Sequence, residues 1–220
     1  MNQESLGKLF LRAAESGSYV EIQRLVHAGA DVNFRDRLDQ TALTIASMRG
    51  HIEPIQFFVE NGADVNAMGK NGLSALMKAS EDGNVEVVKI LTYNCADVNA
   101  RTRCGDTALI LASGNGHADV IRFLVNNGAD VNARNGNEVT SLIRASEGGH
   151  LDTIKILLES GADVNARTTN GWTALISASL YGYAAAVKVL IESRANIDAH
   201  IKGGITVLGV LLRNLYQPLD

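Results

Sequence analysis

Gly128-Ala-Asp-Val-Asn132 decides the fold, because this stretch returns along the chain at a fixed interval. The same five residues begin at Gly29, Gly62 and Gly161, and altered copies begin at Cys95 (CADVN) and Arg194 (RANID). Consecutive starting points are separated by a constant step of 33 residues. A fixed period of this length is the signature of similar structural units stacked side by side.

A second column of residues repeats with the same period and in the same register. Its segments TALTIA, SALMKA, TALILA, TSLIRA, TALISA and TVLGVL begin at Thr41, Ser74, Thr107, Thr140, Thr173 and Thr206. Two columns in phase over nearly the whole chain indicate a single array, 1–220, with no domain boundary. We place its units at 1–33, 34–66, 67–99, 100–132, 133–165, 166–198 and 199–220, with a cap at the N-terminus and a partial cap at the C-terminus.

Each unit is predicted to hold two short helices and a turn. In residues 41–66, Thr41 is placed to cap the first helix and Gly50 to end it. Ile52, Ile55 and Phe58 follow at three-residue spacing, which predicts a second helix with one apolar face. So short a pair cannot bury that face alone, so it must stack on its neighbours. The predicted fold class is therefore all-α.

Composition excludes several classes of protein. The net charge of −4 argues against sequence-independent nucleic-acid binding, which needs a basic excess. No run approaches the roughly 20 apolar residues of a membrane span, and the N-terminal stretch lacks the features of a signal peptide. The 2 Cys are too few for a disulfide framework or a four-Cys zinc site. We expect a soluble protein in a reducing compartment that contacts neither membrane nor nucleic acid.

The pattern resembles the ankyrin repeat. That family has a 33-residue period, T-P-L-H-x-A in the first helix, G-H between the helices and G-A-D-V-N after the second, and the resemblance covers about residues 5–216. It implies an ankyrin-repeat solenoid of about seven units, with β-turn fingers projecting beside the helix pairs. It also implies a concave face, made by the fingers and first helices, that binds other proteins. The location implied is cytoplasmic, or a host cell if the chain is a delivered bacterial protein.

The chain departs from the family pattern at three positions of the repeat, the first being the family's Pro after Thr, which is Ala42, Ala75, Ser141 or Ala174 here. In the family, the His of the first helix ties neighbouring turns together by hydrogen bonds. It is replaced here, so we expect apolar contacts to hold the turns together instead; the replacements are Thr44, Met77, Ile110, Ile143 and Ile176. Cys95 and Arg194 stand where the family has Gly after the second helix. A side chain in that left-handed backbone costs roughly 1 kcal/mol.

No constellation of residues predicts catalysis. His51, His117 and His150 share one repeat position, and layers about 8–10 Å apart keep them from a shared metal. The recurring aspartates are interpreted as turn carboxylates that accept backbone N–H groups; they are Asp31, Asp64, Asp97, Asp130 and Asp163. We therefore predict no enzyme, no cofactor and no metal site.

The partner-binding residues are carried over from the family's variable contact positions. They are Arg37, Met48, Arg49, Lys70, Leu73, Arg103, Asp106, Val139, Trp172, Leu180 and Tyr181. A finger column of Arg35, Arg101, Arg134 and Arg167 adds a basic edge that would steer a partner with an acidic surface. Trp172, with Leu180 and Tyr181, is a candidate anchor because aromatic residues are enriched in hot spots. The alternatives are that the charges are merely solvated and that Trp172 packs on the neighbouring finger.

Two other functions stay open. Asn99, Asn132 and Asn165 resemble acceptors of asparaginyl hydroxylation, with the favoured Leu eight residues upstream; the alternative is an unmodified turn Asn. The apolar segment 205–216 is interpreted as a cap of the stack. The alternative is that the protein is a structural spacer or assembly element, which interacts with other molecules through this terminal unit. We expect a monomer, with a dimer through this C-terminal helix as the alternative.

Overall fold

A computed structural model describes residues 2–202, 204, 206, 207 and 209. The chain forms two compact units, Met1–Arg103 and Cys104–Asp220. Helices are the regular elements of the described residues, together with two isolated β-bridges, Met68 with Ser74 and His200 with Thr206. The predicted all-α fold is confirmed, whereas the seven repeat boundaries stay a prediction. Within the described ranges, no helix has the length and apolar character needed to cross a membrane.

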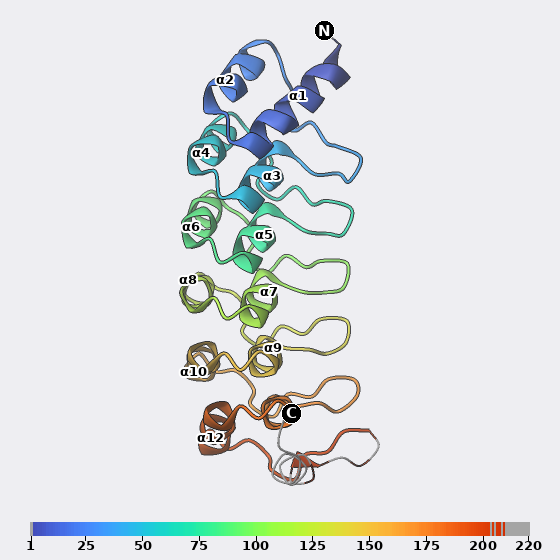
Figure 1. Ribbon diagram of the computed structural model, residues 1–220, viewed down its shortest axis with the longest axis vertical. Helices are drawn as coiled ribbons and strands as arrows, with labels where there is room; N and C mark the ends of the chain where they lie inside the picture. The colour runs from blue at the N-terminus through green and yellow to red at the C-terminus, as the bar shows by residue number, and fades with distance from the viewer. Residues whose placement is uncertain (1, 203, 205, 208, 210–220) are drawn as a thin grey trace, which may run out of the picture. The chain divides into compact units, whose positions relative to one another are not determined.

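The first unit contains three helix pairs. These are α1 (Gln3–Ser16) with α2 (Tyr19–His27), α3 (Ala42–Arg49) with α4 (Ile52–Glu60), and α5 (Ala75–Glu81) with α6 (Val85–Tyr93). The first helices α1, α3 and α5 contact one another in order, and α2, α4 and α6 do the same. In this unit the two sets form neighbouring layers, from which the long loops project to one side (Figure 1).

The second unit repeats this arrangement. It contains α7 (Ala108–Gly114) with α8 (Ala118–Asn126), α9 (Ser141–Glu147) with α10 (Leu151–Glu159), and α11 (Ala174–Leu180) with α12 (Ala184–Glu192). Helix α9 packs between α7 and α11, and α10 packs between α8 and α12. Within each unit, neighbouring pairs therefore bury their apolar faces against one another, as expected for repeats too small to fold alone.

Hydroxyl side chains cap the first helices of the later pairs, α3, α5, α7, α9 and α11, as predicted for Thr41. The Thr41 Oγ1 accepts a hydrogen bond from the backbone N–H of Thr44 at 3.3 Å, and Gly50 ends α3 with a φ of 71°. The same cap recurs at Ser74, Thr107, Thr140 and Thr173. A cap of this kind satisfies a backbone donor that no helical carbonyl can reach, so each first helix starts at a defined residue.

The core consists of the recurring apolar columns. Leu43 and Ala46 of α3 are buried, as are Ile55 and Phe58 of α4. In the first unit Phe58 meets Phe10 edge to face, with ring centroids 5.4 Å apart. The residues that replace the family's His are also buried, so they join this core; they are Thr44, Met77, Ile110, Ile143 and Ile176.

The loop tips are joined to one another by main-chain hydrogen bonds. In the first unit the N–H of Lys70 donates to the carbonyl of Leu38 at 2.9 Å, and that of Arg103 donates to Asn71 at 3.1 Å. In the second unit the equivalent donors are Gly136, Thr169 and Lys202. We call this series the fingertip ladder. Gly72 shows how closely the tips approach, because a Cβ there would lie 2.8 Å from the backbone nitrogen of Arg103.

Four residues other than glycine adopt the left-handed backbone. Cys95 and Arg194 do so, with φ of 66° and 68°, as predicted. Asp39 and Glu138 do so as well, with φ of 59° and 62°, and they were not predicted. Their loop position is filled by Gly72, Gly105, Gly171 and Gly204 in other repeats.

The predicted C-terminal dimerisation helix, 205–216, lies outside the described residues apart from 206, 207 and 209. Its role as a cap, spacer contact or dimer interface stays a prediction.

Candidate functional site

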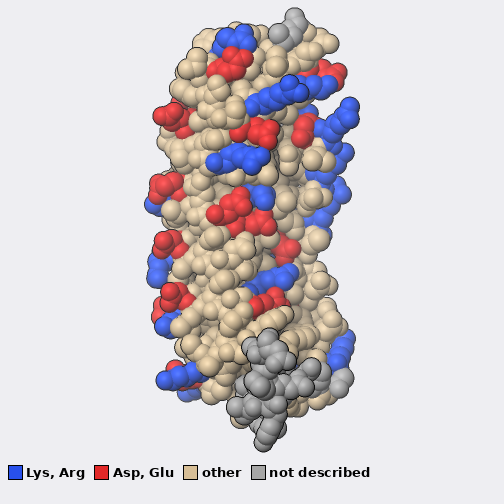
Figure 2. All heavy atoms as spheres, viewed as in Figure 1, with Lys and Arg blue, Asp and Glu red and all other residues tan. Residues whose placement is uncertain are grey.

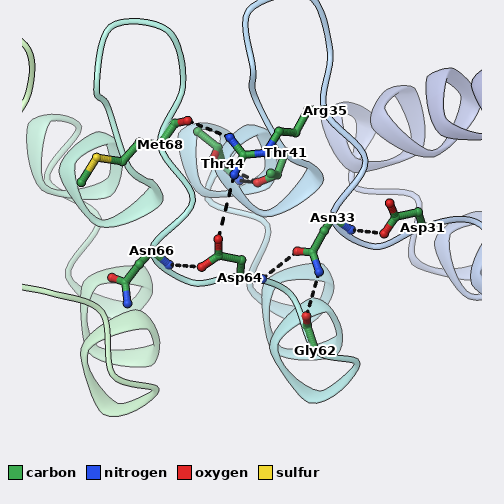
Figure 3. A network of polar contacts seen from close by, with 9 residues as sticks. All are labelled: Asp31, Asn33, Arg35, Thr41, Thr44, Gly62, Asp64, Asn66 and Met68. Carbon is green, nitrogen blue, oxygen red and sulfur yellow. Dashed lines mark hydrogen bonds and ion pairs between the residues drawn. The ribbon is translucent and has the colours of Figure 1, made fainter.

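A column of asparagines joins each turn to the next. The Asn33 amide donates from Nδ2 to the carbonyl of Gly62 at 3.0 Å, and its Oδ1 accepts from the N–H of Asp64 at 2.7 Å (Figure 3). Both bonds are also made by Asn66 in the first unit and by Asn132 and Asn165 in the second unit. Hydrogen bonds from this asparagine column therefore link successive turns. This network holds the projecting loops in a regular series.

The aspartate and histidine columns have structural roles. The Oδ1 atoms of Asp31 and Asp64 accept the backbone N–H of the residue two positions on, at 2.9 and 3.0 Å, which confirms the predicted turn role. The Nε2 atoms of His51 and His150 each lie 3.0 Å from a backbone carbonyl oxygen of the preceding repeat. Among the described residues, no group of three or more His, Cys, Asp or Glu is arranged to hold a metal ion.

The predicted finger arginines bond to neighbouring loops. Arg35 donates to the carbonyl of Met68 at 3.0 Å and lies 3.9 Å from the Asp64 carboxylate (Figure 3). Arg134 lies 3.0 Å from Glu138 and 3.8 Å from Asp163, and Arg167 donates to the carbonyl of His200. Arg101 is also exposed. These guanidinium groups brace the loops while one face of each stays in water, which reduces the charge they offer a partner.

A second set of cations stands at the loop tips. Arg37, Lys70 and Arg103 occupy one repeat position in the first unit, and all three are exposed. In Figure 2, Lys and Arg gather along the edge of the first unit where its loops project. The Arg37 charge reaches the carboxyl of Glu4, whose pKa is lowered chiefly by a hydrogen bond from Lys8 and to a smaller extent by Arg37.

Predicted contact residues of the first unit line three shallow grooves. Met48 and Arg49 line one of 220 Å³ together with Glu15, which pairs with Arg49 at 2.9 Å. Lys70 and Leu73 line one of 80 Å³ with Leu38, whose side chain is 57% exposed. Arg37 lines a third, of 540 Å³, beside Phe34. The loops and first helices of this unit thus hold the predicted residues on hollowed surface.

In the second unit one groove of 350 Å³ brings three predicted residues together. Val139, Trp172 and Tyr181 line it, and we call it the Trp172 groove; its other lining residues are Asn137, Arg144, Glu147, Thr168, Thr169, Asn170 and Ser177. Trp172 is half-buried and Tyr181 is 55% exposed. Val139 is only 8% exposed, so it packs in the core more than it faces a partner.

Two predicted residues of the second unit lie beside this groove without lining it. Leu180 is half-buried in the last turn of α11. Asp106 is also half-buried, and its Oδ1 accepts a hydrogen bond from the Asn135 amide at 2.7 Å. Asp106 therefore orders a loop.

One of the residues that line the Trp172 groove, Ser177, has a small side chain. Ser177 shares its repeat position with larger residues, Ile45, Lys78, Leu111 and Arg144. Its side chain is fully buried, and its Oγ has no hydrogen-bond partner. Leaving a buried hydroxyl without a partner costs about 1–3 kcal/mol.

Sequence reasoning did not single out Ser177 or the Arg144–Glu147 ion pair, whose atoms are 3.1 Å apart. A signal for them exists in the sequence, since this column varies in size and charge while the neighbouring Leu column stays constant. Variation at one position of an otherwise regular repeat marks side chains that the stack itself does not require.

The candidate hydroxylation residues are exposed, but their side chains are engaged in interactions within the fold. Asn99, Asn132 and Asn165 are all exposed, and the amides of the last two make both bonds of the turn network. Leu124 and Leu157, eight residues upstream, are fully buried in α8 and α10. An enzyme that reads this leucine therefore needs the repeat to open.

Comparison with known proteins gives one match. A family model for ankyrin repeats in three copies matches residues 10–102, 92–168 and 133–202. No curated protein matches the chain.

Proposed function

Because the chain belongs to the ankyrin repeat family, whose repeats are protein–protein interaction modules, we propose that it is a non-enzymatic module that binds a partner protein through its loops and first helices. The Trp172 groove carries this proposal. It combines an exposed tyrosine, a half-buried tryptophan and an unpaired hydroxyl at one place. Tyr, Trp and Arg are the residues most enriched in interface hot spots.

The rigid setting of the groove supports the same function. Helices α9 and α11 pack against each other, and the N–H of Thr169 donates to the carbonyl of Asn137 across the groove's loops at 3.1 Å. The backbone N–H of Trp172 donates to the Oγ1 of Thr168 at 3.1 Å. A surface ordered before binding loses little conformational entropy when a partner docks, so more of its contact energy becomes affinity.

Affinity capture from a lysate, read by mass spectrometry, tests the proposal. Trp172→Ala should lose the captured partner and weaken its affinity by roughly 2 kcal/mol in calorimetry. Ser177→Leu should block the groove with a side chain that the same repeat position already accommodates as Leu111. Tyr93→Ala, which removes a 71% exposed aromatic ring from α6, is the matched control and should retain the partner.

The competing function is a structural spacer that acts through its terminal unit. A spacer would keep its partner in both groove variants and lose it when the apolar residues of 205–216 are replaced. That result would overturn the proposed function, as would full affinity of the Trp172→Ala protein for an identified partner.

A further inference from the structure

The three loop-tip cations of the first unit contribute little to holding the fold together, the interaction shown being the weak attraction of Arg37 for the Glu4 carboxylate. Arg37, Lys70 and Arg103 are exposed, and none of their side chains forms a hydrogen bond or ion pair with another described residue. This distinguishes them from Arg35, two residues before Arg37, which bonds to the next loop. Charges that the fold does not use are available to a partner.

The fingertip ladder sets the distance between these cations. The N–H groups of Lys70 and Arg103 bond to the preceding tip, so the backbone of each cationic residue is held beside the loop before it. Helices packed in contact lie about 8–10 Å apart, and equivalent residues of successive repeats recur at about this step. The first unit therefore presents three positive charges in a row at a regular spacing.

The second unit provides an internal comparison. Its residues at the same repeat position are Gly136, Thr169 and Lys202, so a single cation stands where the first unit has three. The row is thus a property of these particular repeats and is not required by the architecture. It is also confined to the loops of a protein whose net charge is −4.

Nearby carboxylates are largely engaged by the fold. The Oδ1 of Asp36 accepts hydrogen bonds from the backbone N–H groups of Leu38 and Gln40 at 2.7 and 2.9 Å. This carboxylate is therefore bonded within its own loop. Glu4 bonds to Lys8, and Asp39 is half-buried in its left-handed turn. Lys70 and Arg103 have no acidic residue within two positions in the first unit. The row therefore keeps a positive face.

We infer that Arg37, Lys70 and Arg103 bind an extended acidic segment of a partner protein that carries a carboxylate at every third residue. A chain in the polyproline II conformation has three residues per turn and rises about 3.1 Å per residue, so every third side chain points the same way at intervals of about 9 Å. This interval matches the step between repeats. A β-strand repeats its same-side residues at about 7 Å, which does not match.

The shallow groove beside Lys70 favours a thin occupant. Its volume is 80 Å³, and Leu38 and Leu73 line it together with Lys70 and Lys78. This space suits one apolar side chain of an extended segment, whereas an α-helix is about 10–12 Å wide. The inference deepens the proposed protein-binding function and rests on it, but it concerns a different unit from the Trp172 groove.

Synthetic peptides test the spacing directly. The probe is a fluorescent nine-residue peptide with Glu at the first, fourth and seventh positions and Pro elsewhere. Its control has the same composition with the three Glu adjacent. At low ionic strength the spaced peptide should bind the wild-type protein more tightly, by several-fold in fluorescence anisotropy, and added salt should weaken it.

Matched variants of the protein test the site. The triple variant Arg37→Gln, Lys70→Gln, Arg103→Gln should bind the spaced peptide about tenfold more weakly, since each exposed ion pair contributes little alone. The control variant Arg122→Gln, Lys155→Gln, Lys188→Gln removes three cations that also recur every 33 residues, on α8, α10 and α12. It should bind as the wild type does. Circular dichroism melting verifies that both variants fold.

Three results would overturn the inference. Equal binding of the spaced and clustered peptides would show that charge alone acts. An equal loss in both triple variants would show non-specific attraction, and tighter binding of a single-stranded oligonucleotide would indicate nucleic acid as the occupant. Trp172→Ala should leave peptide binding unchanged. If the spaced peptide does not bind while Trp172→Ala still loses a captured partner, the acidic-segment inference is wrong and the proposed protein-binding function is retained.

Discussion

The backbone N–H of Asp163 donates a hydrogen bond to the Oδ1 of Asn132 at 2.7 Å, and the same side chain donates from Nδ2 to the carbonyl of Gly161 at 3.1 Å. One amide thus satisfies a donor and an acceptor of the next turn at once. Since the residue recurs at the same position of successive repeats, this bond pair connects neighbours in both units.

Replacing Asn132 by Ala should destabilise the second unit. The change leaves one backbone N–H and one carbonyl without their partner, and the expected loss is about 1–2 kcal/mol because water reaches both groups in part. Urea unfolding followed by circular dichroism measures it. Asn126→Ala, at an exposed position on the end of α8, is the control and should change the free energy of unfolding by less than about 0.5 kcal/mol. Equal effects of the two changes would contradict a structural role of the column.

Gly161→Ala isolates the cost of a left-handed backbone. Gly161 has a φ of 87°, and a Cβ there would meet no atom within 4 Å, so no clash contributes. We expect a loss of about 1 kcal/mol from the backbone conformation alone. A melting temperature equal to that of the wild type would show that the turn relaxes at no cost.

Arg194→Gly should have the opposite effect at the equivalent position one repeat later. Arg194 adopts a φ of 68°, so glycine removes the unfavourable side chain and raises the free energy of unfolding by up to about 1 kcal/mol. Flexibility gained by the unfolded chain offsets part of this increase. Differential scanning calorimetry decides the sign, and a clear drop in melting temperature would show that Arg194 makes stabilising contacts.

Thr140→Ala should remove the cap of α9. The Thr140 Oγ1 accepts the N–H of Ile143 at 3.4 Å, and the site is buried, so water cannot fully replace the bond. The expected loss is about 1 kcal/mol in thermal unfolding. Thr140→Ser keeps the hydroxyl and should recover most of the stability. If serine and alanine were equally destabilising, the lost methyl group and not the cap would be responsible.

Hydroxylation of Asn165 should depend on opening of its repeat. Leu157 is buried in the folded unit, so a hydroxylase that reads it gains access only when α10 detaches. The Asn132→Ala variant should therefore be modified faster than the wild type, as measured by mass spectrometry of the peptide containing Asn165. Equal rates would mean that the folded turn is recognised. The absence of any added oxygen in both proteins would show that the chain is not a substrate.

Periodicity made most of the fold predictable. Thr41 and Gly50 bound α3 as predicted, and the register of the repeat placed Cys95 and Arg194 in the left-handed backbone. The left-handed backbone of Asp39 and Glu138 was predictable from the same register, since glycine fills their position in other repeats, but these two residues were not predicted. The role of the asparagines was missed because a bond between turns needs their relative positions, which a period alone does not provide.

The candidate site was predictable only in part. Trp172 and Tyr181 were expected on one surface, and both line one groove. Several side chains form the groove together, so its shape could not be predicted from any single residue. Val139 illustrates the converse, because its position in the repeat suggested exposure while its neighbours cover it.

The fingertip ladder joins main-chain atoms only, as in the bond from the N–H of Lys70 to the carbonyl of Leu38. Such bonds form whatever side chains the two residues carry, and glycine, threonine and lysine all serve as donors in the second unit. Mutation can therefore rewrite the chemistry displayed at the tips without altering their alignment. Evolution is thus able to redirect this scaffold from one target to another through a handful of point changes, each neutral to folding.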